Sequence, residues 1–293
     1  INNHCTLLFE QKMLNSYDSV FNFETLIIQG AILLACCYGI VRPIFVISVD
    51  YGLAILVFGA ILVWFLLRAA FEKGFSSTLV ALLIQSIVLG AYGLRLAYFI
   101  HQRNKRESYM SSRKGSFSKP VSYALTIPLW ILVAFVYLCY GLPVLIGYRA
   151  FRNGYHCNVA FHIAGTVVMV ASLIIESLSD YLKNKSKLEN PNRFCDIGIY
   201  RYCRMPNYFG EMLFWTGCTF SCLKDDMSWL QAGFCVFGIV CAYYIMLHSA
   251  SALDKSQFDR YHNDEEYMKY RCEVPVLIPF TQWYSMIKVD KTD

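Results

Sequence analysis

Residues 51–71 read Y-G-L-A-I-L-V-F-G-A-I-L-V-W-F-L-L-R-A-A-F, a stretch with one charged side chain, that of Arg68. About 20 apolar residues in a helix are enough to cross the hydrocarbon core of a bilayer. The strands of a membrane β-barrel are shorter and alternate in polarity, which this stretch does not do. We therefore expect a membrane-spanning helix here.

Six more apolar runs make seven in all. They occupy residues 25–48, 78–100, 120–148, 157–179, 208–223 and 229–250. The first is interrupted by Arg42-Pro43, which would kink a helix, and the sixth is short, so six or eight spans are alternatives. The runs predict an all-α, polytopic membrane protein with about seven transmembrane helices.

The composition agrees with this class of protein. Of the 293 residues, 56% are hydrophobic and 16% are charged, against about 25% charged in a typical soluble domain. A chain this apolar is neither a soluble domain nor a disordered one. We expect it to lie in the lipid bilayer and to bind no nucleic acid. We divide it into an N-terminal extension (1–24), a seven-helix membrane domain (25–280) and a C-terminal tail (281–293).

Basic residues orient the expected helices. The loop 101–119 carries six lysines and arginines against one glutamate, and residues 180–207 carry six against three acids. The loops that would lie on the other side carry four against three. Because basic loops stay on the cytosolic side, we expect these two segments and the C-terminus in the cytosol or its topological equivalent. The endoplasmic reticulum or a bacterial-type inner membrane is the expected location, and the mitochondrial inner membrane is an alternative.

The twelve cysteines form no Cys-x-x-Cys pair. Seven of them, Cys218 and Cys235 included, lie inside apolar runs, where cysteine behaves as a small buried hydrophobe. The spacing gives no support for a zinc or redox site, and we expect no metal.

Residues 195–217, C-D-I-G-I-Y-R-Y-C-R-M-P-N-Y-F-G-E-M-L-F-W-T-G, are not explained by topology alone. Pro206 suits the first turn of a helix. One turn later Glu211 would point into the bundle, where a carboxylate is expensive unless it is paired or functional. Arg201 and Arg204 beside this helix start would form a phosphate clamp, or one of them would form a structural ion pair with Glu211.

Other polar residues also lie inside apolar runs. Glu176 and Asp180 share one helix face and repel each other unless a lysine or a ligand with hydroxyls or an amide bridges them. Arg95 must reach the interface, pair or bind an anion, and Tyr92 on the same face could donate a hydrogen bond to a substrate carbonyl. Asp50, between the first two runs, could be only a loop residue.

Four blocks, taken in order along the chain, resemble a known family. They are G-L-R-L at 93–96 followed by Arg103-Asn104, E-S-L-S-D-Y-L-K at 176–183, G-I-Y-R-Y-C-R-M-P-N-Y-F-G-E at 198–211 and E-Y-M-K-Y-R-C-E-V-P-V-L-I-P-F at 266–280. Together they resemble the steroid 5α-reductase-like superfamily, in particular a bacterial-type branch of unknown function beside the reductases. The third block is the most specific.

The resemblance implies a membrane reductase that binds NADPH from the cytosolic side. Asn207 and Glu211 would contact the nicotinamide half of the cofactor. The ribose and phosphates would be held by Asp180, Lys183, Arg201, Arg204 and Tyr208, helped by Arg95 and Asn104, with Glu176 on the same helix face as Asp180. Tyr92 matches the tyrosine that hydrogen-bonds the enone carbonyl in the steroid reductases. The acid on the second span of those enzymes has no clear match, but Asp50 resembles an acid found near that place in the branch of unknown function.

In that chemistry a hydride passes to the β-carbon of a C=C bond conjugated to a carbonyl, and negative charge builds on the carbonyl oxygen. Tyr92 is the expected donor to that oxygen, and a lipid-like substrate would enter from the bilayer. Met205 departs from the pattern, because many relatives have histidine before the proline. Asp254-Lys255 stands where relatives often have Glu-Lys.

Two other functions stay open. The isoprenylcysteine carboxyl methyltransferase-like family shares an Arg-His-Pro-x-Tyr-x-Gly block and would use S-adenosylmethionine, but Asn207, Glu211 and Met205 fit it less well. A non-catalytic subunit of a larger membrane assembly that keeps a reductase-like fold would account for Met205 and for the unmatched acid.

Overall fold

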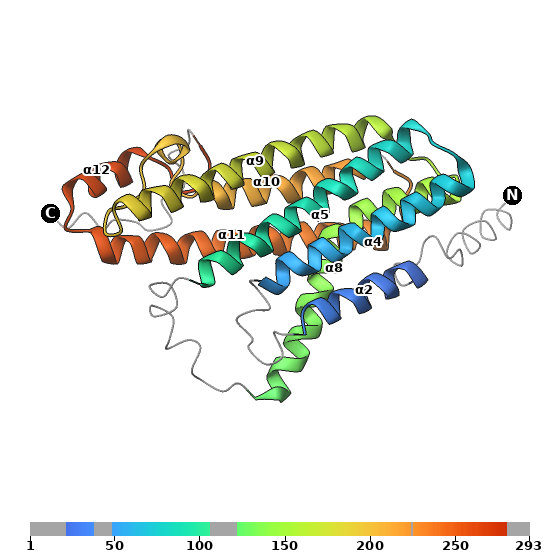
Figure 1. Ribbon diagram of the computed structural model, residues 1–293, viewed down its shortest axis with the longest axis horizontal. Coiled ribbons are helices and arrows are strands. Elements are labelled where there is room, and N and C mark those ends of the chain that lie inside the picture. The colour runs from blue at the N-terminus through green and yellow to red at the C-terminus, as the bar shows by residue number, and fades with distance from the viewer. Residues whose placement is uncertain (1–21, 38–48, 106–121, 224, 280–293) are drawn as a thin grey trace, which may run out of the picture. The chain divides into compact units, whose positions relative to one another are not determined.

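The structure is a computed structural model that describes residues 22–37, 49–105, 122–223 and 225–279. Within these residues every regular element is a helix, which confirms the all-α prediction. In chain order the elements are α2 (Phe23–Ala35), α4 (Val49–Lys73), α5 (Ser77–Asn104), α8 (Tyr123–Asn153), α9 (Val159–Glu189), the 3₁₀ turn η2 (Gly198–Arg201), α10 (Pro206–Ser221), α11 (Trp229–Tyr261) and α12 (Glu265–Glu273) (Figure 1).

Five helices in the described part of the chain are long and apolar enough to cross a membrane: α4, α5, α8, α9 and α11. They confirm a polytopic membrane protein. The first predicted span corresponds to α2, whose 13 residues cover about 20 Å, less than the roughly 30 Å of a hydrocarbon core. The sixth corresponds to α10, which has 16 residues and is short, as expected. Arg42-Pro43, residues 1–21, the loop 106–121 and residues 280–293 lie outside the described residues.

The chain forms two compact units. Unit 1 comprises Ile1–Thr166 and Cys218–Ile239, and unit 2 comprises Val167–Gly217 and Val240–Asp293. Helices α9, α10 and α11 contribute residues to both. The two units are described separately below.

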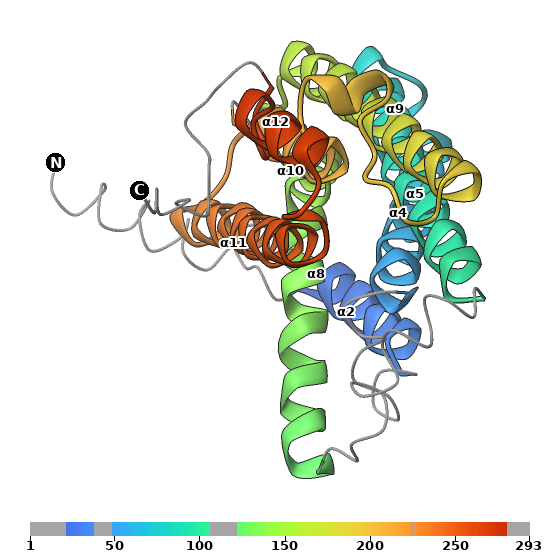
Figure 2. The same cartoon turned by 90° about the vertical axis from the view of Figure 1, so that its left-hand side faces the viewer.

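In unit 1, glycines bring α4 and α5 together, and the two helices lie side by side in Figure 1 and in Figure 2. A Cβ added to Gly93 would lie 2.6 Å from the carbonyl oxygen of Gly52, and one added to Gly59 would lie 2.6 Å from the backbone nitrogen of Gly90. In a bilayer, small residues let helix backbones approach closely enough to pack. The start of α4 is thereby paired with the second half of α5.

The helix ends follow from local sequence signals. Gly74 and Gly154 have left-handed φ angles of 79° and 74° just beyond α4 and α8, a position that favours glycine. Ser76 and Asp264 cap α5 and α12 by accepting hydrogen bonds from backbone N–H groups of the first turn. The connections from α4 to α5 and from α8 to α9 are therefore short.

In unit 2, α10 packs closely on α9 through Gly210. A Cβ on this residue would lie 3.2 Å from the Cβ of Glu176 and 3.2 Å from the carbonyl oxygen of Ser172. Any larger residue at position 210 would push the two helices apart. The contact sets the spacing of the helices that carry most of the predicted cofactor residues.

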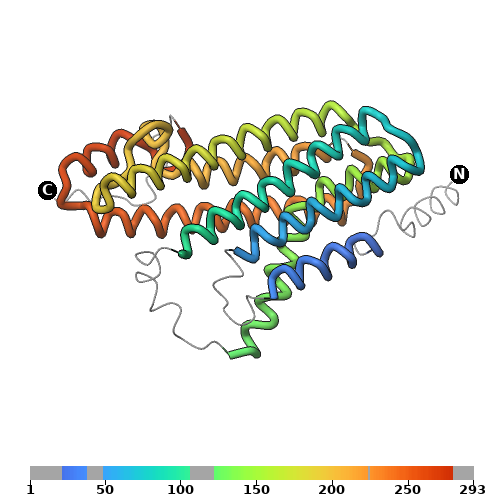
Figure 3. The backbone as a smooth tube through the Cα atoms, in the orientation of Figure 1, coloured from blue at the N-terminus to red at the C-terminus, as the bar shows by residue number. Residues whose placement is uncertain are grey.

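The closing segment of unit 2 is tied to the residues before α10. Helix α12 folds back after α11 (Figure 3). Beyond it, the carbonyl oxygen of Pro275 accepts the N–H of Arg204 at 2.9 Å, and that of Leu277 accepts the thiol of Cys203 at 2.8 Å. The last two of the four sequence blocks therefore lie against each other.

Candidate functional site

Three of the predicted cofactor-binding carboxylates lie in the interior of unit 2. Glu176 and Asp180 are one turn apart on α9 and are 4% and 9% exposed. Glu211 on α10 is 8% exposed and directly follows Gly210, which packs on Glu176. Buried carboxylates are costly unless they have polar partners. The packed faces of α9 and α10 are therefore polar as well as close.

Asn207 and Tyr208 lie in the first turn of α10, and both are half-buried. Pro206 begins the helix, as predicted, because the missing N–H of proline costs nothing at that position. The N–H groups at the start of a helix favour anionic ligands. Helix α10 thus begins where the predicted phosphate clamp requires a helix N-terminus.

Arg204 is held by a buried ion pair. Its guanidinium bonds to the carboxylate of Asp254, and its Nε donates to the carbonyl oxygen of Val274 at 3.0 Å. Arg271 reaches the second oxygen of Asp254 at 3.0 Å. The sequence offered Glu211 as the structural partner of Arg204, and it did not single out Asp254. Two guanidinium groups share this one carboxylate, so the cluster keeps a net positive charge.

Beside Arg204 lies a small basic pocket with a cavity volume of about 100 Å³, which is partly open to solvent. Four cationic residues are among those that line it: Lys183, Lys187, Arg204 and Arg260. Four aromatic residues also line it: Phe194, Tyr200, Tyr261 and Tyr270. Lys183 and Arg204, which the sequence predicted to bind the cofactor, therefore meet in one pocket. Lys187 and Arg260 were not predicted.

Tyrosine hydroxyls fix the walls of the basic pocket. Tyr200 donates to the carbonyl oxygen of Ser179 at 3.2 Å, and Tyr270 donates to the carbonyl oxygen of Tyr200 at 2.7 Å. Lys187 donates to the hydroxyl of Tyr261 at 2.8 Å. Burial raises the pKa of Tyr200 and of Tyr270, so both phenols stay neutral and keep donating.

Met205 occupies the position where the resemblance leads one to expect histidine. It is 1% exposed and packs in an apolar cluster with Met212, Met246 and Val276. A polar imidazole in the same place would need a hydrogen-bond partner. This position is therefore part of the core of unit 2.

The predicted catalytic pair lies in unit 1. Asp50 is in the first turn of α4 and is 1% exposed, so it is a buried helical residue rather than a loop residue. Tyr92 on α5 is fully buried, and its hydroxyl lies 3.4 Å from that of Tyr51. Tyr51 in turn stacks on Tyr137 of α8 with ring centroids 4.9 Å apart. Tyr51, which follows Asp50 in the sequence, was missed because nothing in its spacing sets it apart from an interface tyrosine.

The remaining predicted residues lie in less enclosed positions. Arg95 is half-buried in unit 1, and its guanidinium lies over the ring of Phe99, 5.6 Å from the centroid. Asn104 is the last residue of α5 and is half-buried. In unit 2, Arg201 is exposed at the end of η2 and does not line the basic pocket.

Comparison with known proteins gives one match. A family model described as "Protein of unknown function (DUF1295)" matches residues 45–274. No curated protein and no solved structure matches the chain.

Proposed function

We propose that this chain, which belongs to the DUF1295 family of proteins of unknown function, is an NADPH-dependent membrane reductase that acts on the C=C bond of an enone-type lipid or steroid. The basic pocket of unit 2 carries the proposal. It is lined by cations from α9, α11 and the segment before α10.

The residues of unit 2 suit a dinucleotide phosphate. Lys183 and Arg260 would hold its phosphates, because ammonium and guanidinium groups bind phosphate oxygens by charge-assisted hydrogen bonds. Lys187 donates to Pro191, Arg193 and Tyr261 and would contribute its positive charge. Arg204 is engaged with Asp254 and would contribute mainly through the positive charge of its cluster.

The other proposed contacts follow the family resemblance. The carboxylates of Glu176 and Asp180 would accept hydrogen bonds from the ribose hydroxyls, and the hydroxyl of Tyr208 would donate to the ribose. Asn207 and Glu211 would bind the carboxamide of the nicotinamide. Arg201 would add a contact to the phosphates. A carboxamide needs both a donor and an acceptor, which an asparagine and a buried carboxylate together provide.

NADPH supplies a hydride when bound. The protein must stabilise the negative charge that develops on the carbonyl oxygen of the substrate, and we assign this role to Tyr92. Its hydroxyl is fully buried in unit 1, and a donor in a water-poor site stabilises an oxyanion far more than it would in water. Tyr51 would orient the Tyr92 hydroxyl, and the buried carboxylate of Asp50 would help to orient it.

The substrate and the compartment complete the proposal. A lipid-like substrate can reach apolar helices from the bilayer, while the charged cofactor comes from the cytosolic side, where the basic segments are expected. The endoplasmic reticulum membrane or a bacterial-type inner membrane would provide both the lipid-like substrate and access to cytosolic NADPH.

NADPH binding to the full chain, purified in detergent, tests the proposal. Intrinsic fluorescence or calorimetry should give saturable binding of NADPH and none of S-adenosylmethionine. Glu211→Gln should weaken the binding, while the matched exposed change Glu265→Gln should not. Binding of S-adenosylmethionine alone would assign the chain to methyltransferase chemistry. Binding of neither ligand would leave the non-catalytic subunit as the better function.

A further inference from the structure

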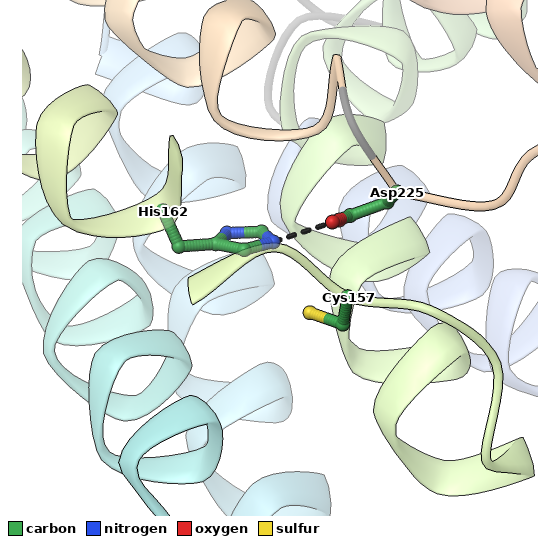
Figure 4. A group of neighbouring side chains, drawn as sticks. All are labelled: Cys157, His162 and Asp225. Carbon is green, nitrogen blue, oxygen red and sulfur yellow. Dashed lines mark hydrogen bonds and ion pairs between the residues drawn. The ribbon is translucent and has the colours of Figure 1, made fainter. Parts of the chain in front are cut away.

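A second polar cluster lies in unit 1 and takes no part in the proposed reductase chemistry. Cys157 is in the connection between α8 and α9, His162 is in the first turn of α9, and Asp225 is in the connection between α10 and α11. Figure 4 shows the imidazole of His162 directed at the Asp225 carboxylate, with the Cys157 sulfur beside the pair. One ligand atom from each residue lies within 4.8 Å of the other two.

Hydrogen bonds fix the orientation of the histidine. Its Nδ1 lies 2.8 Å from the amide oxygen of Gln85, and its Nε2 lies 2.7 Å from Oδ2 of Asp225. An amide oxygen accepts hydrogen bonds, so Nδ1 carries the hydrogen. With a hydrogen on Nδ1, the contact of Nε2 with a carboxylate oxygen is favourable only where a positive charge lies, either as a second proton on the ring or as a bound cation. The His162 and Asp225 side chains are both 0% exposed, so water cannot screen the two.

The surroundings hold these groups in place. Oδ1 of Asp225 accepts the N–H of Asn158 at 2.8 Å. Gly147 leaves room for the imidazole, because a Cβ there would lie 2.5 Å from Cε1 of His162. Histidines that bind a metal typically donate their other ring N–H to a fixed acceptor, which is the role that Gln85 has here.

We propose that Cys157, His162 and Asp225 bind a divalent transition-metal ion of the zinc class. A thiolate, an imidazole nitrogen and a carboxylate oxygen form a donor set that suits Zn²⁺, and three protein ligands leave the fourth tetrahedral position to a water molecule. At zinc–ligand distances of about 2.0 to 2.3 Å, ligand atoms in a tetrahedron are roughly 3.3 to 3.8 Å apart. The His162–Asp225 pair would open by about 0.6 Å and Cys157 would move inward by up to about 1.3 Å.

The ion would cross-link two connections of unit 1. The N–H of Asp226 already bonds to the carbonyl oxygen of His156 at 3.0 Å, so the two connections lie against each other without it. By the charge bias of the loops, both face away from the cytosol. The expectation of no metal came from the lack of a Cys-x-x-Cys pair, a pattern that does not join Cys157 and His162 to Asp225 in a distant segment.

Metal titration of the full chain in detergent tests the site. The chain is stripped with a chelator and titrated with Zn²⁺ against a chromophoric indicator, and with Co²⁺ for its absorption spectrum. We expect about one ion per chain and a sulfur-to-cobalt charge-transfer band. Cys157→Ser, which is nearly isosteric, should abolish the band and weaken Zn²⁺ binding by at least about tenfold. Cys241→Ser, a matched half-buried cysteine outside the cluster, should change neither.

Two results would overturn the proposal. One is the lack of stoichiometric Zn²⁺ binding, which would make the cluster a hydrogen-bonded His162–Asp225 pair only. The other is binding whose affinity and spectrum are the same in Cys157→Ser and Asp225→Asn as in the wild type, because the ion would then be held elsewhere. Cys157→Ser keeps the test decisive if Asp225→Asn fails to fold.

Discussion

Arg204 and Asp254 form an ion pair whose side chains are 2% and 0% exposed, although fifty residues separate them in the chain. The pair joins the segment before α10 to α11, and Arg271 joins α12 to the same carboxylate. It lies in the wall of the basic pocket, because Arg204 lines that pocket. The pair therefore contributes to the stability of unit 2 and to the positive charge of the basic pocket.

Asp254→Ala should destabilise unit 2 strongly. Removing one partner of a buried ion pair leaves an uncompensated charge in the interior, and such changes cost about 3 to 5 kcal/mol. Thermal unfolding in detergent would measure the loss. Asp259→Ala, an exposed change on the same helix, is the control, and Asp254→Glu should restore part of the stability. Equal stability of the Asp254→Ala and Asp259→Ala variants would show that the pair contributes nothing.

Gly93→Ala should loosen the contact between α4 and α5. The new methyl group would meet the backbone of Gly52 and Leu56, which cannot move aside as a flexible side chain can. We expect a loss of about 1 to 3 kcal/mol in the free energy of unfolding. Gly30→Ala on α2, where a Cβ would meet nothing within 4 Å, should be neutral or slightly stabilising. An unchanged unfolding transition for Gly93→Ala would contradict the close packing.

Tyr92→Phe should slow the proposed reaction without weakening cofactor binding. Loss of a buried donor to a developing oxyanion typically lowers the turnover number by about 10² to 10³. The readout is NADPH consumption with a lipid enone as the probe substrate, together with the dissociation constant for NADPH. Tyr98→Phe removes an exposed hydroxyl from the same helix and should leave both quantities unchanged. Full activity of Tyr92→Phe would remove this tyrosine from the mechanism.

Cys203 should resist alkylation. Burial raises the pKa of its thiol to about 12, so at pH 8 only roughly one thiol in ten thousand is ionised, and the thiolate is the reactive form. Cys272 on α12 is exposed and should be modified much faster. Mass spectrometry after a timed maleimide reaction would compare the two sites. Equal labelling of Cys203 and Cys272 in the folded chain would contradict the contact between Cys203 and the closing segment.

The helices could be predicted from the sequence because each depends on a local run of apolar residues. The run 51–71 became α4, Val49–Lys73, and Pro206 begins α10 as expected. Here the period and length of the apolar pattern were sufficient.

The candidate site could be predicted only in part, because its contacts join distant segments. Local motifs singled out Lys183 and Arg204, which line one pocket. Asp254, Lys187 and Arg260 were missed, since charged residues in a polar helix look the same whether they face solvent or a pocket. Asp50 was a catalytic candidate for which a loop position stayed open, because a single acid between two apolar runs is typical of a connection.

The most direct test of the proposed cofactor site is the dissociation constant for NADPH of Lys183→Ala and Lys185→Ala beside the wild type. Both lysines are on α9, but Lys183 lines the basic pocket, whereas Lys185 is exposed and does not. Loss of a charge-assisted hydrogen bond to a phosphate costs about 1.5 to 3 kcal/mol, so Lys183→Ala should weaken binding by roughly tenfold or more. Lys185→Ala should bind as the wild type does. Equal dissociation constants for Lys183→Ala and the wild type, or no saturable binding by any of the three, would contradict a cofactor site in this pocket.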